Sequence, residues 1–147
     1  MFHLPDPDRQ PQFYAAVPAK RLLAWVIDMV LILALSLVAV LLTAFVGAFV
    51  WPLLVLVIGF AYRVVTLANG SATWGMRFAG IEFRTAQGTR FDIQMALAHT
   101  TGYTISIAVP ILQVISIVMM LTSARGQGLS DAFLGTVALN RRSVINA

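Results

Sequence analysis

Two long stretches of this chain carry no charged side chain. None of Asp, Glu, Lys or Arg occurs from Met29 to Tyr62, and none occurs from Ile93 to Ala124. Each stretch is longer than the roughly 20 apolar residues that cross the core of a bilayer as a helix. The sequence therefore predicts an all-α membrane protein, folded as a small multi-pass helical bundle.

The composition excludes a water-soluble globule. Hydrophobic side chains make up 59% of the 147 residues and charged side chains only 11%. A soluble domain carries about a quarter charged residues, so this chain has too little polar surface to cover itself in water. The first apolar run is also longer than the roughly 7 to 15 residues of a signal-peptide core, so we expect it to remain as a membrane anchor.

Three apolar spans are predicted, at residues 22–46, 50–67 and 93–121. The first two are joined by an uncharged turn near Gly47 and should form an antiparallel hairpin. A polar, Gly-containing loop follows at 68–92. Within it, the alternation of Phe78–Arg84 predicts a short strand. We thus expect a polar N-terminal tail at 1–19, a membrane domain at 20–142 and a C-terminal tail at 143–147.

The third span admits two arrangements. As one helix it is about 43 Å long, enough for a single tilted crossing, whereas folding at Pro110 gives arms of about 25 and 17 Å, the second too short to cross. Length favours one crossing, but charge favours folding back. Basic residues cluster before the first span, between the two blocks and after the second, and only an even number of passes places all three clusters in the cytoplasm. We favour two helical hairpins, the second one folded back or re-entrant, with both termini and the loop cytoplasmic.

The sequence offers little chemistry for catalysis or for a cofactor. It has no Cys, and its two histidines, His3 and His99, lack metal-ligand spacing. No nucleophile with a base and no paired carboxylates are visible, so we expect no enzyme and no cofactor or metal site. The net charge of +4 does not indicate nucleic acid, because the basic residues mark membrane sidedness rather than one aromatic-lined face.

Three motifs in the chain resemble those of the RDD family of bacterial membrane proteins. They are Lys20–Asp28, Gly70–Ile81 and Leu129–Val137, in that order. The family is named for one Arg and two Asp, which correspond here to Arg21, Asp28 and Asp131. The resemblance implies a protein of the bacterial inner membrane. It also implies a role in transport, because the family has been proposed to take part in the transport of ions or other ligands.

Asp28 is the one carboxylate inside a predicted span. It follows Arg21 by seven residues, so the two share a helix face and Asp28 lies about 10 Å deeper. A lone carboxylate there costs about 2.5 to 3.5 kcal/mol and needs a partner or a proton. Arg63, counted back from the end of the second span, lies at a similar depth. A buried Asp28/Arg63 pair is therefore expected, either as a structural pair that fixes helix register or as a cation-exchanging carboxylate gated by Arg63.

Other polar residues have both structural and functional interpretations. His99 and Tyr103 belong to the polar start of the second apolar block, where they either line a polar path or bond to neighbouring helices. Relatives in the RDD family often carry an Arg where this chain has Ala98 and His99, so His99 stands in that place. Asp131 follows Ser130 and is expected to cap a short helix or to pair with Arg21.

Two functions remain open at this point. In the first, the chain exchanges protons or small cations through a homo-oligomer, because three or four helices are too few to enclose a path alone. In the second, it is a non-catalytic accessory or assembly subunit of a larger membrane protein complex. Both functions place it in the lipid bilayer and neither involves nucleic acid.

The predicted topology can be measured with reporter fusions. We expect tags at both termini to report from the cytoplasm, because an even number of passes returns the chain to its starting side. A C-terminal reporter active only outside the cytoplasm would show instead that the second apolar block crosses once.

Overall fold

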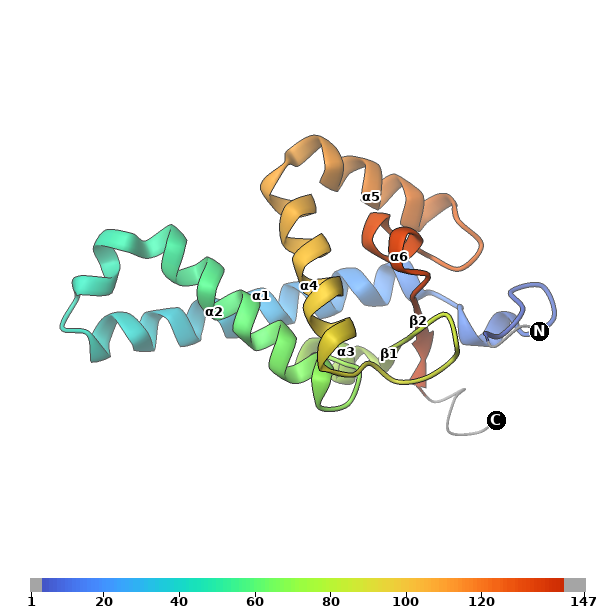
Figure 1. Ribbon diagram of the computed structural model, residues 1–147, viewed down its shortest axis with the longest axis horizontal. Helices are drawn as coiled ribbons and strands as arrows, with labels where there is room; N and C mark the ends of the chain where they lie inside the picture. The colour runs from blue at the N-terminus through green and yellow to red at the C-terminus, as the bar shows by residue number, and fades with distance from the viewer. Residues whose placement is uncertain (1–3, 142–147) are drawn as a thin grey trace.

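The computed structural model of the protein describes residues 4–141 and consists of a long helical hairpin, a helical elbow and a small sheet (Figure 1). His3 and the expected tail at 143–147 lie outside the described residues. The elements in chain order are the 3-10 helix η1 (Pro11–Phe13), α1 (Val17–Leu42), the 3-10 helix η2 (Val46–Val50), α2 (Trp51–Ala68), α3 (Trp74–Ala79), β1 (Ile81–Arg84), α4 (Ile93–Ala108), α5 (Pro110–Thr122), α6 (Leu129–Leu134) and β2 (Val137–Asn140).

Helices α1 and α2 form the first hairpin and are both long and apolar enough to cross a membrane. Helix α1 begins at Val17, earlier than the expected span, with Pro18 in its first turn where its missing N–H is no loss. It ends at Leu42, because Ala44 and Phe45 adopt φ values of 52° and 70° and turn the chain. The hairpin therefore closes through a tight, uncharged tip.

The second apolar block forms an elbow. The chain bends by 116° between helices α4 and α5. Pro110 opens α5, and Val109 before it takes the extended conformation that a following proline favours, which ends α4. With 16 and 13 residues, the two arms are about 24 and 20 Å long. The block thus folds back rather than running as one straight span.

The loop between the hairpin and the elbow contributes to a two-stranded antiparallel sheet. Strand β1 pairs with β2, with Ile81 opposite Asn140. The expected strand at 78–84 was too long, because Phe78 and Ala79 complete helix α3. That helix ends at Gly80, whose φ of 80° suits glycine. The partner strand β2 was not predicted from the sequence.

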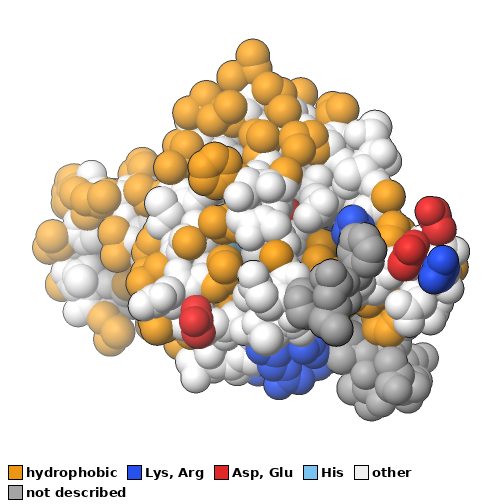
Figure 2. Space-filling view, turned by 45° about the vertical axis from the view of Figure 1, so that its right-hand side comes forward, with side chains coloured by type: hydrophobic (Ala, Val, Ile, Leu, Met, Phe, Trp, Pro, Cys, Tyr) orange, Lys and Arg blue, Asp and Glu red, His pale blue; other side chains and the backbone are white. Residues whose placement is uncertain are grey.

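The packed core lies where the open end of the hairpin meets α3, α4 and the sheet. Its buried apolar residues are Val17, Ala24, Leu67, Ala72, Met76, Ile81, Phe83, Phe91, Ala96 and Ala138. By contrast, the hairpin tip and the elbow expose large apolar side chains, such as Phe49 at 90% and Leu121 at 69%. Figure 2 shows apolar side chains gathered over two projecting parts of the molecule, at the top and at the left, with most of the visible charged side chains at the bottom and at the right. The arrangement fits a molecule whose helices are solvated by lipid and whose polar end is packed.

A glycine on α3 provides a test of this packing. A Cβ on Gly75 would lie 2.2 Å from the carbonyl oxygen of Ala24, whereas one on Gly59 would lie 3.6 Å from Ile32. We expect Gly75→Ala to lower the free energy of unfolding by about 1 to 3 kcal/mol through overpacking. Gly59→Ala, the matched control, should be neutral or stabilising by up to about 1 kcal/mol because it improves helix propensity. Thermal unfolding in detergent, followed by tryptophan fluorescence, measures both; equal stabilities would contradict the close contact of α3 with α1.

Candidate functional site

Asp28 on α1 is buried and accepts three hydrogen bonds from two other segments. Its donors are the Tyr62 hydroxyl on α2 at 2.6 Å, the Thr73 hydroxyl at 2.7 Å and the Gly75 N–H at 2.9 Å. The carboxylate is 3% exposed. Burial of a charged group is expensive unless it is hydrogen-bonded, and these donors meet that requirement within the chain. Asp28 therefore joins α1 to both α2 and α3.

The first turn of α3 explains why the loop folds onto Asp28. Helix N-termini leave backbone N–H groups without helical acceptors. Thr73 is the N-cap, and its hydroxyl accepts from the Met76 N–H at 3.2 Å while donating to Asp28. The Gly75 N–H is bonded directly to Asp28. A carboxylate from a neighbouring helix thus completes the cap of α3, and the absence of a side chain at Gly75 allows the close approach.

The structure does not bring Asp28 and Arg63 together. The guanidinium carbon of Arg63 lies 3.9 Å from the ring centre of Tyr103 on α4. Within residues 4–141, Arg63 forms no ion pair. The depth of a residue along a helix does not determine its rotation about the helix axis, and it is the preceding residue, Tyr62, that faces Asp28. Tyr103 in turn accepts a hydrogen bond from Trp25 Nε1 at 2.8 Å.

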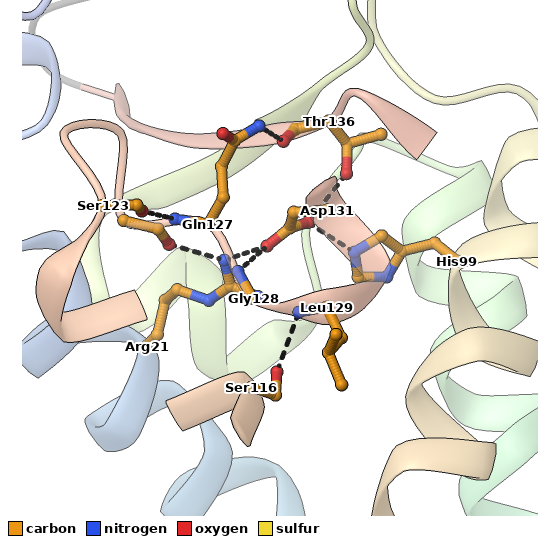
Figure 3. Close-up of polar contacts among 10 residues, drawn as sticks. Arg21, His99, Ser116, Ser123, Gln127, Gly128, Leu129, Asp131 and Thr136 are labelled. Atoms are coloured by element: carbon orange, nitrogen blue, oxygen red, sulfur yellow. Dashed lines mark hydrogen bonds and ion pairs between the residues drawn. The ribbon is translucent and has the colours of Figure 1, made fainter. Parts of the chain in front are cut away.

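Asp131 is the centre of a second network, shown in Figure 3. It is completely buried and forms an ion pair with Arg21 of α1. His99 Nε2 of α4 lies 2.8 Å from its other oxygen, and the Thr136 hydroxyl donates to that oxygen at 2.7 Å. The Gly128 N–H, at the start of α6, donates at 3.1 Å. Asp131 thus caps α6 and pairs with Arg21 at once, so both roles weighed from the sequence occur together.

His99 is buried against Asp131 and two aromatic rings, while its Nδ1 atom has no hydrogen-bond partner. Because an ionised carboxylate only accepts hydrogen bonds, the Nε2 atom of His99 is the donor to Asp131. Its ring packs against Phe83 and Phe91, with centroids 4.4 and 5.5 Å away. His99 is 1% exposed. Its position is that of a buried structural partner of Asp131, and Tyr103 lies in a different contact, against Arg63.

The pKa of Asp131 lies well below its ordinary value. Burial raises this pKa, but the charge of Arg21 and the hydrogen bonds from His99 and Thr136 outweigh burial. A carboxyl whose pKa is lower in the folded state stabilises the fold above its ordinary pKa, and that contribution disappears only as the pH falls through the folded-state value. Asp131 is therefore ionised, and its network fully formed, at neutral pH.

Two further polar contacts were missed in the sequence. Glu82 on β1 is fully buried and pairs with Arg84 at 3.1 Å and Arg90 at 3.5 Å. The position of Glu82 in a segment that alternates like a strand was the one sequence feature that could have indicated its burial. Asn140 on β2 accepts from Lys20 Nζ at 2.6 Å and donates to the carbonyl of Gln12 at 2.8 Å. No local sequence pattern indicates this contact, because its partners lie at opposite ends of the sequence.

Comparison with protein families identifies the chain. The model of the RDD family matches residues 15–135. The chain belongs to the RDD family. Comparisons with curated proteins and with solved structures return no match. The resemblance carried by the three motifs is thus confirmed, and so is the all-α membrane fold with apolar spanning helices.

The RDD residues divide between the two networks. Arg21 and Asp131 share one, and Asp28 forms the other. Both networks tie the open end of the hairpin to segments that follow it in the chain. Among residues 4–141, no group of three or more His, Cys, Asp or Glu side chains is placed to hold a metal ion. Hydrogen-bond donors of the chain itself bind both carboxylates, and these contacts hold the helices together.

A double-mutant cycle measures the Arg21–Asp131 pair. Arg21→Ala should destabilise the protein by about 3 to 5 kcal/mol at neutral pH, because it leaves the fully buried Asp131 unpaired, and Asp131→Ala should cost less, because the Arg21 side chain is 14% exposed. The double variant should be more stable than the sum predicts by about 1 to 3 kcal/mol. The cycle for Asp28 and Arg63, which are not in contact, should show the smaller coupling. Unfolding in detergent gives the coupling energy of each pair. A larger coupling energy for Asp28 and Arg63 than for Arg21 and Asp131 would favour the Asp28/Arg63 pair expected from the sequence.

Proposed function

We propose that this RDD protein is a non-catalytic accessory or assembly subunit of a larger membrane protein complex. The observation that carries the proposal is that fixed donors of the chain itself occupy both carboxylates of the RDD motif. Asp28 accepts from two hydroxyls and one N–H. Asp131 accepts from an arginine, a histidine, a hydroxyl and an N–H.

Cation exchange needs a carboxylate that binds and releases a proton or a cation in turn. Asp28 is the one carboxylate in α1, α2, α4 and α5. A cation binding there would have to displace the Gly75 N–H and turn both hydroxyl hydrogens away from Asp28, which would release α3 from α1. These contacts favour a structural carboxylate over an exchanging one, and they favour the accessory role over proton or small-cation exchange through a homo-oligomer.

The surface supports a role in assembly. Helix α5 exposes apolar side chains along its length, among them Ile111 at 68% and Val114 at 60%. The elbow and the hairpin tip offer such faces in different directions (Figures 1 and 2). Partner helices and lipid are the neighbours that such faces accept in a membrane. Contact with a larger complex would leave the polar end of the molecule free.

We also propose a location in the bacterial inner membrane with both termini cytoplasmic. The two ends of the described chain meet, since Asn140 donates to the carbonyl oxygens of Gln12 and Ala15, both at 2.8 Å. The fold-back at Pro110 is compatible with an even number of passes. Both features support a chain that starts and finishes on one side.

The accessory role predicts a complex in native membranes. A tagged chain extracted in mild detergent should migrate at a larger mass than the same chain purified alone, because the partner subunits remain attached. Native mass spectrometry of both samples gives the two masses. If they are equal, the chain assembles only with itself and the accessory role is wrong.

The exchange function has its own test in vesicles. With the purified protein reconstituted under a sodium or potassium gradient, we expect no protein-dependent change of internal pH, because Asp28 is fixed by its donors. Asp28→Asn should then give the same internal pH as the wild type. Asp8→Asn, a substitution at an exposed position, serves as the matched control. A pH change that requires Asp28 and survives Asp8→Asn would establish exchange in place of the accessory role.

A further inference from the structure

Arg63 is a buried cation that forms no ion pair with any described residue of the chain. It is 8% exposed, and its Nε atom is enclosed without a hydrogen-bond partner. No carboxylate within residues 4–141 forms an ion pair with it. The ring of Tyr103 covers one face of the guanidinium. Stacking uses that face only and leaves the N–H donors, which point outward in the guanidinium plane, free to bind an acceptor.

The neighbours of Arg63 indicate its depth in the membrane. Arg63 precedes the last residue of α2, Ala68, by five positions, or about 7.5 Å along the helix axis. Tyr103 is hydrogen-bonded to Trp25 Nε1, and Trp25 is 40% exposed. Trp and Tyr are enriched at the level of the lipid headgroups. A long arginine side chain at this position therefore reaches the boundary between acyl chains and headgroups.

A second unsatisfied group lies on the same helix face as Tyr103. Thr100 is three residues earlier on α4, so the two side chains are neighbours on its surface. The Thr100 hydroxyl oxygen is enclosed and has no hydrogen-bond partner. The Nε atom of Arg63 on α2 and the hydroxyl oxygen of Thr100 on α4 are thus two polar atoms without partners on a pair of helices that pack together.

We propose that Arg63, supported by Tyr103 and Trp25, binds the phosphate group of an anionic phospholipid. Guanidinium binds phosphate in a bidentate manner, and basic sites between membrane helices on the cytoplasmic side hold lipid headgroups. Trp25 and Tyr103 are of the residue types enriched at the level of the headgroups, which suits a phosphate as the ligand of Arg63. Trp25 is 40% exposed, so this member of the cluster can contact the surrounding lipid directly. This site is independent of whether the protein is an accessory subunit.

The test measures lipid binding by the full chain in detergent. Native mass spectrometry during titration with phosphatidylglycerol, with phosphatidylcholine and with inorganic phosphate gives the three affinities. We expect phosphatidylglycerol to bind the wild type about tenfold more tightly than phosphatidylcholine does, as one charge-assisted contact gives. Arg63→Gln should remove that preference. Arg9→Gln removes the same charge from an exposed position and should retain it.

Several results would overturn the proposal. Equal binding of the two lipids by the wild type would show that no anionic headgroup is selected. An Arg63→Gln variant that keeps the preference would place the site elsewhere. Displacement of the bound lipid by millimolar inorganic phosphate would assign the site to a free anion. If Arg63→Gln does not fold, Arg63→Lys keeps the charge but loses bidentate binding, and it should show a reduced preference.

Discussion

The ion pair of Arg21 and Asp131 is the interaction on which the rest of this structure depends. Asp131 is completely buried, and a buried charge persists only if it is paired and hydrogen-bonded. The pairing brings together the first turns of α1, the middle of α4 through His99 and the cap of α6. Once these are joined, strand β2 follows α6 directly and lies beside β1. The sheet and the core beneath it are therefore positioned by one carboxylate.

Asp28 has the same role further along the hairpin, where a second buried carboxylate binds the first turn of a short helix. It binds the first turn of α3 and fixes the loop against α1, while Tyr62 adds α2 to the contact. The buried residues of α1 that follow it, Ile32, Ser36 and Val40, recur every four positions and face the rest of the protein. The three residues that name the family thus organise the polar end of a hairpin whose tip is free to contact lipid. Because both carboxylates are bound by donors of the chain, we propose that the RDD motif serves assembly of the fold rather than exchange of protons or cations.

The helices were predictable because long uncharged runs have few alternatives in a membrane protein. Length alone favoured a single straight span, whereas charge favoured a fold at Pro110, and the structure has a bend there. The even number of passes stays a prediction. The strand pairing was not predictable, because β2 is short and its partner lies more than 50 residues earlier, so no local pattern marks it. The partners of Asp28 were missed for another reason. Depth along a helix follows from counting residues, whereas rotation about its axis depends on packing, and packing turned Tyr62 rather than Arg63 toward the carboxylate.

The central claim is that Asp28 is a permanent cap of α3. Amide hydrogen exchange of residues 73–79, measured by mass spectrometry on the reconstituted protein, tests it most directly. The account predicts slow exchange in the wild type that sodium and potassium leave unchanged, and faster exchange in Asp28→Ala, because the Gly75 N–H loses its acceptor. Exchange in the wild type that speeds up when either cation is added would show that the cation displaces α3 from Asp28, and would contradict the account.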